Sequence, residues 1–180
     1  MTLKHHFEMM AAYNQWMNTR VYAASARLEE KDLHADKGAF FGSVFGTLDH
    51  LLVADTIWLK RFADHPASFR ALDAMRPLPH PYSLTVPMHT RFDDLQKARF
   101  AMDDIIIALA TEATDDAYAQ TLTYANRAGE VFTNSYGELM QHVVNHQTHH
   151  RGQITTLLSQ TGIDVGVTDL VAMVREHRSS

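Results

Sequence analysis

The chain has 180 residues, 46% of them hydrophobic and 21% charged, and a formal net charge of −5. The length suffices for one hydrophobic core, and the negative charge without a Lys/Arg cluster argues against a nucleic-acid-binding surface. The absence of cysteine excludes disulfides, thiolate metal sites and a cysteine nucleophile. With neither a signal peptide nor an apolar run of the roughly 18 residues that span a membrane, we expect one cytoplasmic domain over residues 1–180, without membrane contact.

The first predicted helix runs from Leu3 to Glu30, where apolar residues recur at intervals of three and four. Asn14 lies on this apolar stripe, and we interpret it as a buried amide that fixes the register of the helix. Residues 31–39 are predicted to form a polar connector.

The second predicted helix runs from Phe40 to Ala63 and is apolar almost all round. Such a helix is buried on two sides, which predicts a homodimer in which a second subunit covers one of them. Asp55 points into the main apolar stripe and therefore needs a partner. We favour a structural hydrogen-bond acceptor, with support of a metal site as the alternative.

Residues 64–87 contain all five prolines and cannot form a continuous helix. A connection of this length can cross from one end of a helical bundle to the other, which would leave the helices on either side of it parallel. His80 and Tyr82 of this crossover could line the mouth of a site.

The third predicted helix runs from Val86 to Ala113, and we assign its acidic residues, Asp103 among them, to a solvated face. Between Ala119 and Thr133 the helical period breaks. There β-branched residues flank a segment that begins with Asn126 and ends with Gly129, which predicts a short hairpin.

The fourth predicted helix runs from Ser135 to Gln160, and four histidines lie in or beside its apolar stripe. They are His142, His146, His149 and His150. Two imidazoles at i and i+4 can reach one metal ion, but with 12 histidines in 180 residues about one such pair is expected by chance. Core or solvated histidines therefore remain an alternative. A short helix from Thr168 to Arg175 closes the chain.

Several groups of residues resemble motifs of one family. They are Tyr13-Asn14-x-Trp16-x-Asn18, Ser43-x-x-x-Thr47-Leu48-x-His50-x-x-x-x-Asp55-x-x-Trp58, His146-x-x-x-His150-Arg151-Gly152-Gln153 and Asp169-Leu170. In type, spacing and order they are similar to the motifs of the DinB family, and they cover nearly the whole chain.

The resemblance implies an all-α fold, a four-helix bundle in up-down-down-up order with a long crossover between helices two and three. It also implies a divalent metal ion held by His50, His146 and His150. Zinc or nickel is expected, with iron or manganese as alternatives. The helical wheel alone leaves His50 off the main stripe, so the resemblance carries that assignment.

Four further residues are candidates for supporting the ligands or contacting a substrate. They are Asp55, His142, Asn145 and Arg151. Arg151 could reach the rim and pair with an anionic substrate, or form a salt bridge to another helix, which we favour. Asn145 and Gln153 could each hydrogen-bond a ligand ring or the backbone of a neighbouring element, and Gly152 could allow a neighbouring helix to approach.

Three protein ligands with an open position are typical of catalytic metal sites. We therefore expect a metal-dependent enzyme that acts on a small molecule, by thiol-dependent group transfer or by metal-assisted hydrolysis. Relatives of this fold include thiol-dependent transferases and isomerases, which makes a low-molecular-weight thiol a reasonable co-substrate. The alternative is a non-catalytic, stress-linked helical dimer whose metal is structural or a sensor.

Overall fold

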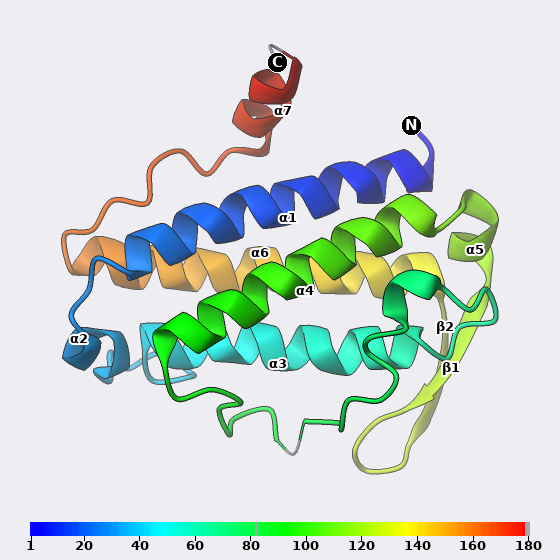
Figure 1. The fold of residues 1–180 in the computed structure, drawn as a ribbon, viewed down its shortest axis with the longest axis horizontal. Coiled ribbons are helices and arrows are strands. Elements are labelled where there is room, and N and C mark those ends of the chain that lie inside the picture. The colour runs from blue at the N-terminus through cyan, green and yellow to red at the C-terminus, as the bar shows by residue number, and fades with distance from the viewer. Residues whose placement is uncertain (82, 179–180) are drawn as a thin grey trace.

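Four long helices make up most of the protein, of which the computed structural model describes residues 1–81 and 83–178. They are α1 (Leu3–Ser25), α3 (Val44–Phe62), α4 (Phe92–Glu112) and α6 (Tyr136–Gln160). Helix α1 packs against α4 and α6, and α3 packs against the same two helices. Figure 1 shows α1 and α6 running in one direction and α3 and α4 in the other, so the two helices that flank the crossover are parallel.

The shorter elements lie at the ends of the long helices and along the crossover. They are α2 (Glu30–His34), the 3-10 turn η1 (Arg70–Leu72), α5 (Asp115–Ala119) and α7 (Leu170–Arg178). The first helix therefore ends five residues earlier than predicted, and α2 forms within the predicted connector. Leu33 of α2 is only 4% exposed, which explains why this segment turns back onto the protein.

The predicted hairpin is confirmed. Strand β1 (Thr121–Ala125) pairs antiparallel with β2 (Val131–Ser135). In the turn, the Asn126 side-chain oxygen accepts hydrogen bonds from the backbone N–H groups of Ala128 and Glu130, and Gly129 adopts a φ of +82°. The Asn side chain supplies the acceptor for this turn, and Gly adopts the positive φ that is unfavourable for other residues.

The crossover extends further than predicted, because α4 begins at Phe92 rather than at Val86, and it is held against α3 at several points. The Asp49 carboxylate accepts hydrogen bonds from the backbone N–H groups of Met88 and His89, and the Lys60 ammonium donates to the carbonyl of Met75. Within the single chain Val53 is fully buried. Most of the second face of α3 is therefore covered within the chain, although Ile57 is only partly buried, and the homodimer stays a prediction.

A buried ionic network lies between α1, α3, α4 and α6. The Arg99 guanidinium contacts the carboxylates of Asp55 at 2.6 Å and Asp103 at 2.9 Å, and all three side chains are at most 1% exposed. The prediction that Asp103 is solvated was wrong, because Arg99 one turn earlier and Asn18 of α1 bind it inside the protein. Asn14 also donates to Asp103, which confirms its interpretation as a buried amide.

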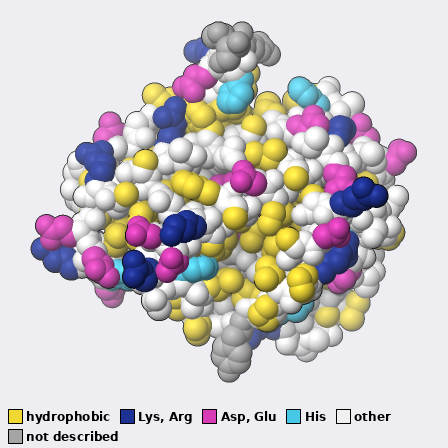
Figure 2. All heavy atoms as spheres, in the orientation of Figure 1, with side chains coloured by type: hydrophobic (Ala, Val, Ile, Leu, Met, Phe, Trp, Pro, Cys, Tyr) yellow, Lys and Arg dark blue, Asp and Glu magenta, His cyan; other side chains and the backbone are white. Residues whose placement is uncertain are grey.

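The surface mixes charge and apolar side chains. Figure 2 shows acidic and basic groups interspersed over the face that α1, α4 and the crossover present, with hydrophobic side chains between them. Crossover residues contribute to the apolar part, for example Leu84 at 45% and Val86 at 53% exposure. Among the described residues no helix has the length and apolar character needed to span a bilayer.

Candidate metal centre

Two capped helices carry the histidine cluster. The Ser43 hydroxyl accepts a hydrogen bond from the Gly46 N–H and begins α3, and a capping box of Ser135 and Glu138 begins α6. Such caps satisfy N–H groups that a helix start leaves without partners. Because both helices start at defined residues and pack together, the positions of their histidines along each helix are fixed relative to one another.

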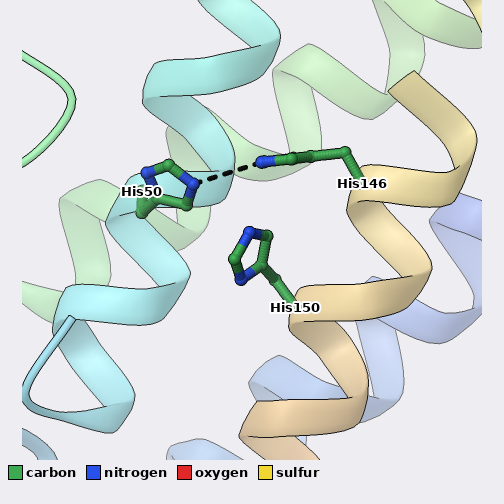
Figure 3. Close-up of side chains that lie close together, drawn as sticks. All are labelled: His50, His146 and His150. Atoms are coloured by element: carbon green, nitrogen blue, oxygen red, sulfur yellow. Dashed lines mark hydrogen bonds between the residues drawn. The ribbon is translucent and has the colours of Figure 1, made fainter. Parts of the chain in front are cut away.

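The side chains of His50, His146 and His150 converge between α3 and α6 (Figure 3). One ring nitrogen from each lies within 4.8 Å of the others, and the Nε2 atoms of His50 and His146 are 3.2 Å apart. Two nitrogens bound tetrahedrally to one zinc ion at about 2.0–2.1 Å would stand roughly 3.3 Å apart. The donor set and its spacing therefore fit a divalent ion.

Hydrogen bonds on the far side of two rings fix their tautomers. The Nδ1 of His50 lies 3.1 Å from the carbonyl oxygen of Leu84, and the Nδ1 of His150 lies 2.7 Å from the side-chain oxygen of Gln153. Each oxygen accepts a hydrogen bond from Nδ1–H, which leaves the Nε2 lone pair available for the cluster. Metal-binding histidines usually donate their second ring N–H in this way.

The environment keeps the three imidazoles neutral. Burial lowers the pKa of His50 and of His150, and burial together with the neighbouring histidines lowers the pKa of His146 to about 3. Neutral imidazole is the form that binds metal ions. At neutral pH the cluster therefore has three unprotonated donors.

Phe41 shields one side of the cluster. Its ring stacks on His50 with 3.7 Å between centroids and meets His150 edge to face at 5.4 Å. The sequence predicted this residue inside the second helix, but α3 begins at Val44, so Phe41 belongs to the loop before it.

A cavity of about 550 Å³ opens beside the cluster, which lies within the usual range for small-molecule sites. His50 and His146 form one end of it, and His142 lies next to them. Much of the rest is apolar, with Trp58 and Leu84 among the lining residues. Two of the three clustered histidines, His50 and His146, therefore line this cavity.

Comparison with known proteins identifies the family of the chain. The family model described as "DinB family" matches residues 1–178. The chain belongs to the DinB family. The chain is similar to Protein DinB of Bacillus subtilis (strain 168), at 25% identity over 162 residues that cover 87% of each protein. No solved structure gave a significant match.

Of the further candidate residues in this DinB protein, Asp55 and Arg151 lie in the buried network. Asp55 accepts hydrogen bonds from Arg99 and Gln147, as expected for a structural acceptor. Arg151 is 3% exposed and donates to the Asn14 side chain of α1. A contact between Arg151 and another helix was the favoured expectation, although the partner is a buried amide of α1 rather than a carboxylate, and the alternative position at the rim was wrong.

His142, Asn145 and Gly152 lie on the exposed side of α6. His142 lines the cavity, and its ring centroid is 4.9 Å from that of Trp58. Asn145 accepts a hydrogen bond from Gln141 and contacts no ligand ring; Gln153 holds that role instead. No side chain or backbone lies within 4 Å of a Cβ built on Gly152, so the expected close helix approach was wrong.

One residue that was expected at the mouth of a site lies beside a neighbouring cavity, and one cavity residue was not predicted. His80 lines a neighbouring cavity rather than the histidine cluster, while Tyr82 is outside the described residues. Arg61 lines both cavities and was missed. The sequence did hold a signal, because Arg61 follows His50 by three helical turns and so lies about 20° from it around α3.

Proposed function

We propose that this DinB protein is a metal-dependent enzyme that acts on a small molecule, with His50, His146 and His150 as the protein ligands of a divalent ion. The proposal includes a single domain, with the four long helices as a DinB-type four-helix bundle. The observation that carries it is the convergence of three neutral imidazoles beside a cavity of small-molecule size.

The donor set favours a catalytic over a structural site. A structural zinc site has four protein ligands, whereas a catalytic site has three and keeps a position for water or substrate. Among the described residues, the cluster of groups that could hold a metal contains three histidines and no carboxylate. This supports the enzyme over the alternative of a closed structural or sensing site.

The proposed reaction is thiol-dependent group transfer, with hydrolysis as the second candidate. A divalent ion on three neutral imidazoles supplies Lewis acidity, which lowers the pKa of a bound water or thiol. The carbonyl of Leu84 and the amide of Gln153 keep two of the rings oriented, and Trp58 and Ile57 keep part of the cavity apolar.

His142 is our candidate for the proton acceptor. It lines the cavity, its ring centroid is 5.9 Å from that of His146, and we do not place it among the ligands. Partial burial of its ring in the cavity wall and the nearby Arg61 guanidinium lower its pKa, which leaves a ring nitrogen free to take the proton that a thiol or water loses.

The test combines metal analysis with an activity screen. Purified protein is expected to contain one divalent ion per chain, and His50→Ala and His150→Ala are expected to lose it while remaining folded. His149→Ala, which changes the exposed neighbour of a proposed ligand, is the matched control and should retain the ion. Small thiols are then screened with electrophilic acceptors on the loaded protein. Full metal content in the His50→Ala and His150→Ala proteins would refute the site, and unfolding of both would favour the structural alternative.

A further inference from the structure

The cavity beside the histidine cluster contains two arginines and no carboxylate. Arg61 and Arg127 line it, and the same two arginines line a neighbouring cavity of about 410 Å³ that also includes His80. No aspartate or glutamate is among the described residues that line either cavity. In a chain with a net charge of −5, this is a local concentration of positive charge.

Arg61 is held in place without an acidic partner. Its guanidinium carbon lies 4.6 Å from the ring centroid of Trp58 and 4.9 Å from that of Tyr124, and the group donates to the carbonyl of Ala125 at 3.1 Å. In the described part of the chain no ion pair joins Arg61 or Arg127 to a carboxylate. A stacked guanidinium with donors to spare is suited to bind a planar anion.

The second arginine comes from the hairpin. Arg127 follows Asn126, whose side chain fixes the turn through two backbone hydrogen bonds. Arg127 is exposed at the edge of the cavity. The hairpin thus brings a second positive charge to the end of the cavity that Arg61 occupies.

The two ends of the cavity are separated along α3. His50 and Arg61 lie on the same side of the helix, and a rise of 1.5 Å per residue places their Cα atoms roughly 16 Å apart. Ala54, Ile57 and Trp58 lie between them and give the cavity an apolar middle. A molecule that reaches both ends must be elongated.

We propose that the substrate or co-substrate of this protein is an elongated molecule with an anionic end, a carboxylate or a similar group, that Arg61 binds with help from Arg127. Its apolar middle packs on Trp58 and Ile57, and its reacting end lies at the histidine cluster. This inference rests on the proposed function, because the cluster defines the reacting end. The anion can belong to the thiol or to the electrophile.

The first experiment uses the metal-free full chain, so that it does not depend on metal binding. The protein has two tryptophans, and Trp16→Phe leaves Trp58 as the fluorescent group in the cavity. Phenylbutyrate and its neutral analogue phenylbutyramide are titrated against this background. The carboxylate probe is expected to bind at least about tenfold more tightly than the amide probe. A hydrogen bond between charged groups contributes about 1.5–3 kcal/mol, and about 1.4 kcal/mol corresponds to a tenfold change in affinity.

Arg61→Gln should remove this preference, and Arg61→Lys should restore part of it by keeping the charge. Lys97→Gln, which removes an exposed positive charge from α4, is the matched control and should leave the preference unchanged. Equal affinity for the two probes, no saturable change with either, or an equal loss for both in Arg61→Gln would overturn the inference. The inference would also be overturned if Lys97→Gln lost the preference for the carboxylate probe to the same extent as Arg61→Gln.

The second experiment uses the metal-loaded chain and locates the anion. Mercaptohexanoate carries a thiol and a carboxylate at opposite ends, and mercaptohexanol lacks the carboxylate. If the anion belongs to the thiol, Arg61→Gln weakens only the carboxylate probe, again by about tenfold, and His146→Ala weakens both. If only phenylbutyrate responds to Arg61→Gln, the anion belongs to the electrophile. A preference for the carboxylate in a protein that binds no metal would refute the proposed function alone, whereas metal binding without that preference would refute this inference alone.

Discussion

Removal of the Arg99 guanidinium should cost the protein a large part of its stability. Its side chain is fully buried between the carboxylates of Asp55 and Asp103, at 2.6 and 2.9 Å. Substitution by methionine leaves two buried carboxylates without their cation. Breaking a buried ion pair by removing one partner costs about 3–5 kcal/mol, and domains of this kind are stable by only about 5–15 kcal/mol.

Urea unfolding of Arg99→Met, followed by circular dichroism, measures this loss. With a dependence of about 2 kcal/mol per molar urea, a loss of about 4 kcal/mol moves the midpoint down by about 2 M. Lys97→Met on the exposed side of the same helix is the matched control and should change stability by less than about 0.5 kcal/mol.

A triple variant separates lost charge balance from lost packing. Replacing Asp55 and Asp103 by leucine together with Arg99→Met removes the two carboxylates that lose their cation, and it should recover part of the stability although the buried Arg151 then loses both neighbouring carboxylates. The reasoning would be refuted if Arg99→Met lost less than about 1 kcal/mol, or if the triple variant were no more stable than the single one.

The remaining predictions concern the support of the cluster, a buried histidine and a helix cap. Gln153→Ala should lower metal affinity about 10- to 100-fold in a competition titration with a chelator, because it removes the acceptor that orients His150, and Asn145→Ala should not. Burial lowers the pKa of His65, so the unfolded chain takes up a proton there that the folded chain does not, and stability is lost as pH falls below about 6.5. In metal-free protein His65→Gln should reduce the fall in unfolding free energy between pH 7.5 and 5.5 by up to about 1.4 kcal/mol, and an unchanged pH dependence would contradict this. Ser135→Ala breaks the capping box of α6 and should lower the free energy of unfolding by about 1 kcal/mol. An unchanged midpoint in thermal or urea unfolding would contradict this.

The long helices could be predicted because their apolar residues repeat with the helical period. The start of α6 at Ser135 and the hairpin turn at Asn126 also have local signals, a capping serine and a turn-forming amide. The end of α1 at Ser25 has none, since no glycine or proline stands there. It depends on α2 turning back to bury Leu33, which is a tertiary effect.

The site was predicted less completely than the helices. The periodicity of α3 cannot distinguish its buried faces, so His50 was assigned through the family resemblance alone. The acceptor for His50 is a backbone carbonyl of the crossover, which has no sequence signature. Asp103 was assigned to solvent because acidic residues surround it in sequence, while the partners that bury it include Asn14 and Asn18 of a distant helix.

X-ray absorption spectroscopy of the zinc-loaded protein tests the central claim most directly, because it counts the imidazoles bound to the ion. The account predicts three imidazole nitrogens at about 2.0 Å with a non-protein ligand completing the shell, and a loss of the bound ion in His146→Ala. An ion coordinated without imidazoles, or an identical spectrum from His146→Ala, would contradict it.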